Sequence, residues 1–117
     1  MRYALLIYSN EKDVARMSEQ EQATYMEAYN TFTREVHAQG LLNGGEPLQS
    51  IATATTVRIR DGKTLVTDGP FAETKEQLGG FYLLNCKDLD QAIEIASKVP
   101  DATFGSIEIR PILEVQM

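Results

Sequence analysis

The amino-acid sequence predicts a single α+β domain, residues 1–117, in which two β-α-β halves share one sheet and a β-hairpin is inserted between them. Three observations support this fold class. Segments with strand and helix patterns alternate along the chain. Two of the strands are apolar on both faces. An Asp-Gly pair between two β-prone runs marks a tight turn.

The first half of the chain combines a strand with a long helix. Residues 2–8 alternate as a strand, but apolar side chains occupy both faces, as in a strand that is covered on both sides. Ser18 and Glu21 form a capping box, which predicts a helix over about 19–39 that ends at Gly40. Apolar residues of this helix recur at helical spacing and form one narrow stripe: Tyr25, Tyr29, Phe32 and Val36.

The middle of the chain contains the hairpin. A second strand is expected at residues 41–48, although two glycines and a proline weaken it. The runs 55–60 and 63–67 are rich in Thr, Val and Ile and flank the Asp61-Gly62 pair, which favours a type I′ turn.

The second half repeats the strand–helix–strand order. Residues 79–86 form a strand that is apolar on both faces. Asp88 caps a helix over about 89–98, which Pro100 closes, and a last strand follows at 105–114. The inner face of this helix is expected to carry Leu89, Ala92, Ile93 and Ala96.

This order matches the ferredoxin-like split β-α-β sandwich. Two helices cover only one face of a sheet. Because strands 2–8 and 79–86 are apolar on both faces, we expect a second copy of the chain to cover the other face. The predicted partner is therefore the chain itself, in a homodimer with sheets packed face to face and a cleft lined by Glu108 and Arg110.

Composition and motifs exclude several classes of function. The chain carries 17 acidic and 11 basic residues, a net charge of −6, with no basic run, so nucleic acid and anionic membranes are not expected partners. No apolar stretch is long enough for a signal peptide or a membrane span, which favours a cytoplasmic protein. One cysteine and one histidine leave no multi-Cys or multi-His metal site. Nucleotide-binding and zinc motifs are absent, so neither metal nor cofactor is expected.

Asp68 is the first candidate for chemistry. With a two-residue turn, Val57 pairs with Val66, and Thr55 and Asp68 lie on the same face of the hairpin. A carboxyl group at the end of an apolar face loses hydration, which is one route to a general acid or base. The alternative is a structural carboxylate that accepts hydrogen bonds from the following turn.

Two further features follow the hairpin. Glu73, Lys75 and Glu76 form a polar run that either closes over a cleft, with Lys75 pairing a substrate anion, or is a solvated loop. Gly79-Gly80 either allows close approach of a ligand or marks a bulge at the start of a strand.

The single histidine and the single cysteine have structural alternatives too. His37 lies on the flank of the helical apolar stripe, where it is either an exposed residue without a role or the partner of Asp68 in a catalytic dyad. Cys86 ends an apolar strand and is expected to be a packed core thiol.

Four stretches of the chain form a recognisable pattern: residues 2–8, 53–58, 67–82 and 105–111. The third contains Asp-Gly-Pro-Phe at residues 68–71. With these stretches, nearly the whole chain closely resembles the YCII-related family, and more narrowly the branch of DGPF-domain proteins that is named for those four residues.

The resemblance implies a ferredoxin-like fold of the dimeric α/β barrel type, and it implies no known reaction. A His-Asp pair has been proposed as an active site in YCII-like relatives, which points to Asp68 here. Many sequences of the DGPF branch have a histidine just after the helix-ending glycine, where this chain has Leu41. Relatives encoded near extracytoplasmic-function sigma factors imply a regulatory setting.

Three functions are compatible with these observations. The first is a homodimer that binds a small molecule and that catalyses a cofactor-independent acid–base reaction. Its catalytic candidates are Asp68 and His37. The second is a non-catalytic regulatory or protein-interaction module. The third, a cofactor-independent oxygenase or isomerase, rests on fold analogy alone. The ligand-binding candidates are Gly69, Pro70, Phe71, Glu73, Lys75 and Arg110.

Overall fold

The main sheet has four antiparallel strands in the order β2-β5-β1-β6. The computed structural model describes residues 1–116. The strands of this sheet are β1 (Arg2–Ser9), β2 (Leu42–Pro47), β5 (Gln77–Asn85) and β6 (Ser106–Pro111). Since β5 lies between β1 and β2, and β1 between β5 and β6, each β-α-β half is split by a strand of the other half. The predicted α+β, ferredoxin-like arrangement is confirmed.

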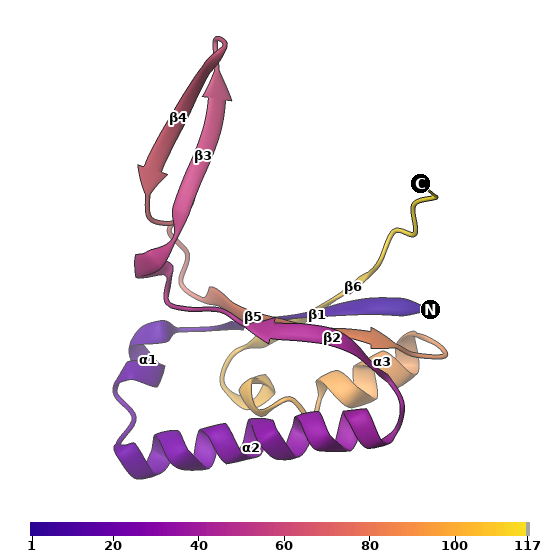
Figure 1. Cartoon of the computed structure of the whole chain (residues 1–117). Coiled ribbons are helices and arrows are strands. Elements are labelled where there is room, and N and C mark those ends of the chain that lie inside the picture. Colours follow the sequence, from indigo (N-terminus) through magenta and orange to yellow (C-terminus); the bar gives the residue numbers. More distant parts are fainter. Residues whose placement is uncertain (117) are drawn as a thin grey trace.

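Two helices cover one face of this sheet (Figure 1). They are α2 (Glu19–Ala38) and α3 (Leu89–Ala96). The predicted capping box at the start of α2 is present, because Ser18 Oγ accepts from Glu21 N and Glu21 Oε1 accepts from Ser18 N. Within the described residues, no helix has the length and apolar character needed to cross a bilayer.

Three short helical segments were not expected from the sequence: α1 (Glu11–Ala15) and the 3-10 turns η1 (Ile51–Thr53) and η2 (Pro100–Thr103). Their periodicity is too short to detect, but each has a local signal. Asn10 and Ser50 accept a hydrogen bond from the backbone N–H two residues on, and Pro100 occupies the first position of its turn.

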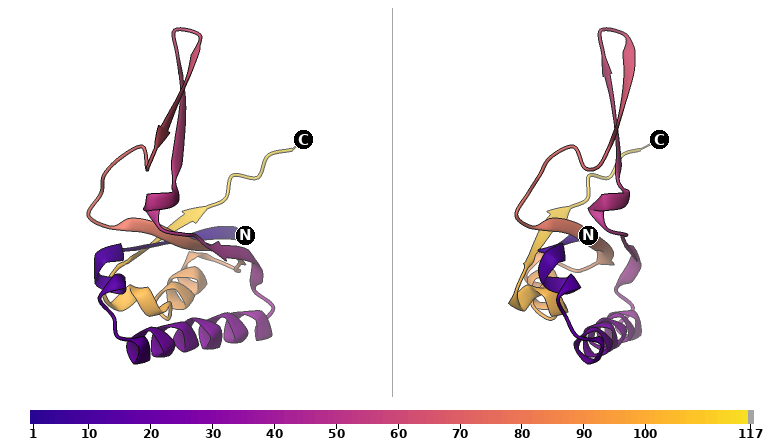
Figure 2. Two further views of the ribbon diagram at one scale, coloured as in Figure 1. Left: turned by 60° about the vertical axis from the view of Figure 1, so that its left-hand side comes forward. Right: turned by 90° about the vertical axis from the view of Figure 1, so that its left-hand side faces the viewer.

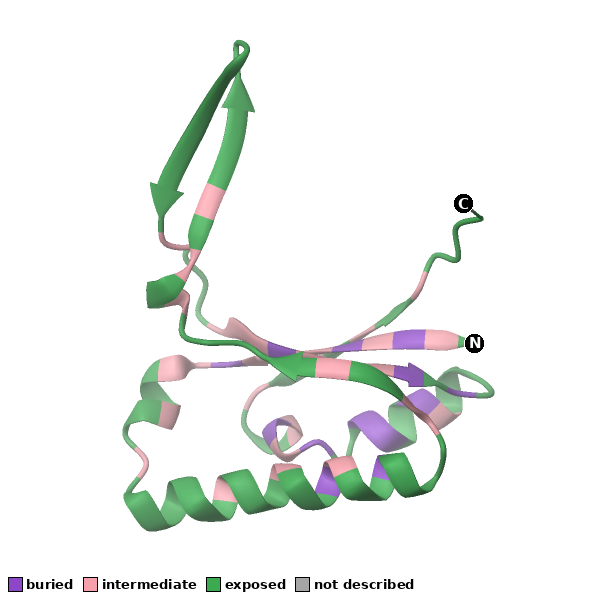
Figure 3. Ribbon diagram, in the orientation of Figure 1, coloured by how far each residue is buried: buried purple, intermediate pink, exposed green. Residues whose placement is uncertain are grey.

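The core lies between the sheet and the two helices (Figure 3). Alternate residues of β1 point into it, so that Tyr3, Leu5 and Ile7 are buried against Phe32 and Val36 of α2. Full burial of a Leu side chain such as that of Leu5 contributes about 1.5–3 kcal/mol. The helical stripe that the sequence predicted is therefore the face by which α2 packs on the sheet.

The inner face of α3 differs from the prediction. Ala92 and Ala96 are buried as expected, but Ile95 is buried in place of Leu89 and Ile93, which are about half exposed. Val99, just after the helix, is also buried. The face of α3 that packs on the sheet is therefore turned about the helix axis toward Ile95 and lies nearer the C-terminal end than predicted.

The inserted hairpin forms a two-stranded sheet of its own from β3 (Thr55–Arg60) and β4 (Lys63–Asp68). It rises from the side of the main sheet that the helices do not cover, as does the chain after β6 (Figures 1 and 2). Asp61 and Gly62 have φ values of 52° and 74°, as a type I′ turn requires, and Thr55 pairs with Asp68 in the predicted register.

Both ends of the second half are shifted from the predicted bounds. Strand β6 ends at Pro111 rather than at residue 114, and the Ile112 N–H still donates to the Arg2 carbonyl. Strand β5 begins at Gln77, and its register against β1 shifts so that Ile7 pairs with Gly80 and Tyr8 with Leu78. Gly79 is the extra residue, which identifies the predicted bulge.

The two adjacent glycines of β5 give a matched test of packing. A Cβ at Gly80 would lie 3.0 Å from the Glu46 carbonyl oxygen and 3.3 Å from Pro47 Cα, whereas one at Gly79 would lie 3.9 Å from the Ile7 carbonyl oxygen. We expect Gly80→Ala to lower the free energy of unfolding by about 1–3 kcal/mol, because β2 must move. Gly79→Ala, the control, is expected to be neutral or slightly stabilising. Equal effects of the two substitutions in urea denaturation would contradict this account.

Candidate functional site

The face of the main sheet that the helices leave open has an apolar centre. In the β1–β5 register, Ala4 pairs with Leu83 and Leu6 with Phe81, and these residues alternate with the side chains that enter the core. Tyr8 continues the same row on β1. We call these five side chains the apolar floor: Ala4, Leu6, Tyr8, Phe81 and Leu83.

Charged side chains border the floor on both edge strands. On β6, Glu108 lies opposite Leu6 and Arg110 opposite Ala4. Arg110 Nη1 is 3.7 Å from Glu108 Oε2, and both side chains are largely exposed. On β2, Glu46 lies opposite Phe81. The pair that sequence analysis placed in a cleft is thus on the open face, where it borders apolar surface.

A third polar group lies at the end of the floor nearest to α1. Ser106 is the neighbour of Tyr8 in the sheet, and its Oγ donates to Glu76 Oε1 at 2.8 Å. Glu76 belongs to the polar run that sequence analysis described as either a lid or a solvated loop. This hydrogen bond fixes the end of the polar run to β6, although Glu76 and Ser106 are 30 positions apart in the sequence.

The DGPF segment, Asp68–Phe71, folds back on the first strand of the hairpin. Gly69 N donates to the Ala54 carbonyl at 2.7 Å, and Thr56 Oγ1 donates to the Gly69 carbonyl at 2.8 Å. Gly69 has a φ of 99°, a backbone conformation that residues with a side chain rarely adopt. This conformation explains why a glycine occupies the position. The turn is therefore held by backbone bonds on both sides of Gly69.

A glutamate that the sequence analysis did not single out anchors the base of the hairpin. Glu11 Oε1 accepts from Ile51 N at 2.9 Å, and Glu11 Oε2 accepts from Ser50 Oγ at 3.0 Å. Its own N–H donates to Gln77 Oε1. These contacts join α1, η1 and β5 across about 40 and 66 residues, a separation over which local sequence patterns carry no signal.

The remaining predicted site residues of this region are exposed. Asp68, Phe71, Glu73 and Lys75 all face solvent, and Pro70 is half-buried. Within the part of the chain that the structure describes, the Asp68 carboxylate has neither an ion pair nor a hydrogen bond, so the bonds to the following turn that the structural alternative requires are not formed. Asp68 does end the Val57–Val66 face as predicted, but this face lies open to solvent.

His37 and Asp68 are not brought together in one chain. His37 is exposed near the end of α2, on the side of the sheet that the helices cover, whereas the hairpin that carries Asp68 rises from the opposite side (Figure 1). The four-stranded sheet separates the two elements. Cys86 is buried, and burial raises the pKa of its thiol, in line with the predicted packed core thiol.

The least expected polar cluster lies on the helix side. Asp101 of η2 is buried, and its Oδ2 accepts hydrogen bonds from the hydroxyls of Tyr25 and Tyr29 at 2.7 and 2.6 Å. Burial, followed by the nearby carboxylate, raises the pKa of both tyrosines. Among the described residues, Asp101 Oδ1 has no hydrogen-bond partner. The apolar stripe showed where the two rings lie, but it did not show that their hydroxyls meet one carboxylate.

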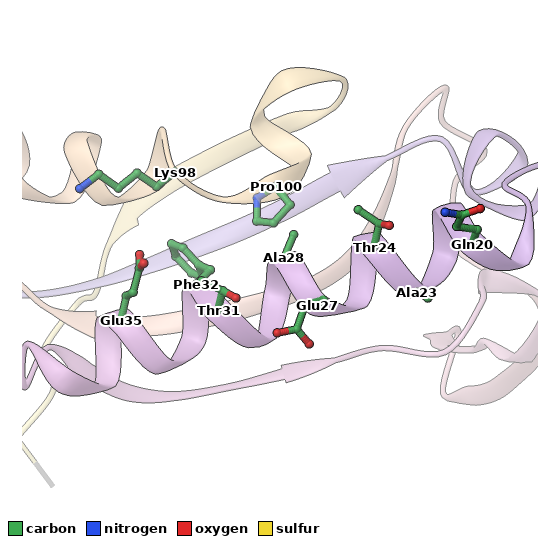
Figure 4. Close-up of a pocket in the computed structure, with 10 residues that line it drawn as sticks. All are labelled: Gln20, Ala23, Thr24, Glu27, Ala28, Thr31, Phe32, Glu35, Lys98 and Pro100. Carbon is green, nitrogen blue, oxygen red and sulfur yellow. The ribbon is translucent and has the colours of Figure 1, made fainter.

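The helix side also carries an open groove of about 710 Å³ along α2 (Figure 4). Figure 4 shows Lys98 and Pro100 on the other side of this groove. None of the site residues expected from the sequence lines it. The lining residues are Gln20, Ala23, Thr24, Glu27, Ala28, Thr31, Phe32, Glu35, Lys98 and Pro100.

The chemistry available on the open face is that of carboxylates and two guanidinium groups beside apolar surface; Arg2 is paired with Glu114, and Arg110 lies beside Glu108. Arg110 is an anion-binding group, and Glu46, Glu76 and Glu108 are hydrogen-bond acceptors. No group of three His, Cys, Asp or Glu residues within residues 1–116 is arranged to hold a metal ion. Such a face suits a ligand with an apolar body and an anionic or hydroxyl group at one edge.

Comparison with known proteins identifies a family and a relative of similar length. The family model of the YCII-related domain matches residues 1–116. An uncharacterized protein of Rhizobium meliloti (strain 1021) is 40% identical over 114 residues, which cover 96% of this chain and 92% of the relative. The name of that relative assigns no activity.

The tyrosine–aspartate cluster predicts how the protein responds to alkaline pH. The folded pKa of Tyr25 and Tyr29 lies above the unfolded value of about 10, so their contribution to stability is complete below pH 10 and is lost as pH rises through the folded values. We expect the 295 nm absorbance titration to show that the Tyr25 and Tyr29 hydroxyls stay protonated until the chain unfolds.

The control for this titration is Tyr29→Phe. Compared with wild type, this variant should show one late-titrating tyrosine fewer, and it should lose about 1–3 kcal/mol of stability because a buried carboxylate loses a hydrogen-bond donor. Ionisation of all five tyrosines near pH 10 in the folded wild type would contradict the assignment.

Proposed function

This chain belongs to the YCII-related domain family, and from that premise we propose that it is a homodimer that binds a small molecule on the open face of its sheet. The observation that carries the proposal is the composition of that face. An apolar floor lies between charged edges, on the same side of the sheet as the DGPF segment.

The floor suits a small ligand because its polar groups are few and directional. Ala4 is the smallest floor residue, and it is the direct neighbour of Arg110 in the sheet, so the face is lowest beside the guanidinium. A carboxylate or phosphate of the ligand pairs with Arg110, and its apolar body packs beside Ala4 at the edge of the floor.

The same face requires a cover. Apolar residues of both central strands of a sheet are left without a second layer in a single chain. A second copy, packed sheet to sheet, buries the floor of each chain against that of the other, and the resemblance to dimeric α/β barrels supports this arrangement.

If the bound ligand is also a substrate, acid–base chemistry without a cofactor is the reaction type that these side chains supply. Asp68 is the proposed base, and Lys75 pairs an anionic group. The own-chain His37 lies behind the sheet, so Asp68 is proposed to act without it.

A second function is favoured by one observation, the exposure of Phe71. Its side chain is 76% exposed, and aromatic residues are enriched in protein-binding surfaces relative to the rest of a protein surface. A regulatory or protein-interaction module, linked to sigma-factor-dependent transcription through the DGPF resemblance, is the corresponding proposal.

Thermal-shift measurements with a metabolite panel test the ligand site. We expect a panel of organic acids, phosphate esters and aromatic metabolites to contain a compound that raises the wild-type Tm by about 5–10 °C at about 100 times its Kd. Asp68→Asn should abolish this shift without changing the Tm of the free protein, because Asp68 is exposed.

Asp61→Asn, the same change at the other end of the hairpin, is the control and should retain the shift. A shift that survives in Asp68→Asn would remove Asp68 from the site. No shift with any compound, while both proteins remain folded, would favour the protein-interaction module.

The proposed sheet-face dimer is tested by measuring the mass of the protein and its dimer Kd in solution. We expect wild type to sediment at twice the 13.0 kDa chain mass. Phe81→Glu should raise the dimer Kd at least about 100-fold, because two carboxylates would enter the interface unpaired. Ile93→Glu on the helix side should leave it unchanged. A monomeric wild type, or equal behaviour of the two variants, would overturn the proposed interface.

A further inference from the structure

The β3–β4 hairpin has no layer to pack on in its own chain. It forms a separate two-stranded sheet that stands away from the main sheet (Figures 1 and 3). None of the buried core residues lies between positions 55 and 68. A two-stranded hairpin of this kind is marginally stable in water, so its order requires a contact elsewhere.

One face of the hairpin is apolar. The register places Val57 opposite Val66, and Ile59 is two residues along on the same face. These side chains are 59%, 64% and 65% exposed in the order Val57, Val66, Ile59. Three neighbouring β-branched residues on one exposed face form an interaction surface rather than scattered surface apolarity.

The exposed area of the chain indicates how large the missing contact is. The chain has 8505 Å² of accessible surface, whereas a compact monomer of its 13.0 kDa mass exposes about 6,300 Å². The difference exceeds the roughly 800 Å² that each partner buries in a standard interface. The radius of gyration, 16.3 Å against about 13 Å for a compact chain of this length, shows the same excess.

The direction of the hairpin identifies the occupant as a second copy. The hairpin rises from the open side of the sheet, and so does the chain after β6 (Figure 2). Strands of six residues span about 20 Å, and packed sheets lie about 10 Å apart. A copy that covers the floor therefore stands beside the hairpin, which reaches past that copy's sheet.

The charge of the hairpin fits the same occupant. From Thr55 to Asp68 it carries three basic side chains and two acidic ones, a net charge of +1, in a chain whose net charge is −6. The basic residues are Arg58, Arg60 and Lys63. A basic segment in an acidic chain is attracted to a second copy of that chain.

We propose that the β3–β4 hairpin is a clasp that packs its Val57, Ile59 and Val66 face against the second copy of the homodimer. The clasp rests on the proposed sheet-face dimer and extends it beyond the floor. The DGPF segment at the base of the hairpin then lies at the junction of the two copies, so each ligand site is bordered by residues of both.

A triple substitution on the apolar face tests the clasp. Val57→Thr, Ile59→Thr and Val66→Thr together keep β-branched side chains and thus the hairpin, but they remove most of the apolar contact. We expect the dimer Kd to rise at least about 100-fold in sedimentation equilibrium, with circular dichroism showing a retained fold.

The matched control removes exposed apolar residues from the helix side. Leu89→Gln with Ile93→Gln should leave the dimer Kd unchanged. If the triple variant dimerises as wild type does, while Phe81→Glu still dissociates, the clasp is wrong and the sheet-face dimer stands. If wild type is monomeric, the homodimer itself fails.

Cross-linking identifies what the hairpin touches. A photoreactive benzophenone amino acid in place of Val66, in unlabelled chains mixed with ¹⁵N-labelled chains, should give links between light and heavy peptides that lie outside the partner's hairpin. Links confined to peptides of the same chain would overturn the clasp. So would links that join only the two hairpins to each other.

Discussion

The structure depends on one geometric constraint: a four-stranded sheet has two faces, and this chain has helices for only one of them. On the covered face, α2 and α3 bury the alternate side chains of β1 and β5, and the core is complete. The carboxylate of Asp101, held by the hydroxyls of Tyr25 and Tyr29, joins η2 to α2 within this layer. Ionisable groups there serve packing, and they are withdrawn from solvent.

The open face of the sheet carries the candidate site and the elements that do not contribute to the core. The apolar floor, the charged edges, the DGPF segment, the hairpin and the chain after β6 all lie on this side of the sheet (Figure 1). Two sets of hydrogen bonds hold them in place there. Glu11 binds the base of the hairpin, and the Arg2 guanidinium donates two hydrogen bonds to Glu114, at 2.7 and 2.9 Å. The hydrogen bonds at its base fix the direction in which the hairpin projects, which favours a contact between the hairpin and another molecule.

Sequence patterns predicted the fold well because its signals are local. Capping at Ser18, the Asp61-Gly62 turn and the alternation of β1 each depend on residues within a few positions of one another. The rotation of α3 was missed because an eight-residue helix gives too few apolar positions to decide between Ile93 and Ile95.

The candidate site was predictable only in part. The pairing of Thr55 with Asp68, and the position of Arg110 on the open face, followed from strand periodicity. The contacts of Glu11, Glu76 and Asp101 did not, because they join side chains 30 to 76 residues apart. The separation of His37 from Asp68 likewise depends on which face of the sheet each element occupies, and no local pattern states this.

The proposed ligand site and the proposed interface share one face, which links ligand binding to association. A ligand that occupied the centre of the floor would replace apolar contacts between the copies and would favour the monomer. Under the proposed function, the ligand is instead held at an edge strand by Arg110, which lies opposite Ala4 and is the cationic residue of β6. There the ligand fills space next to the junction of the two copies and leaves Leu6 and Phe81 free to pack. Coupling between the two equilibria is reciprocal, so a ligand held at this edge by both copies strengthens the dimer by the same factor by which the dimer strengthens ligand binding.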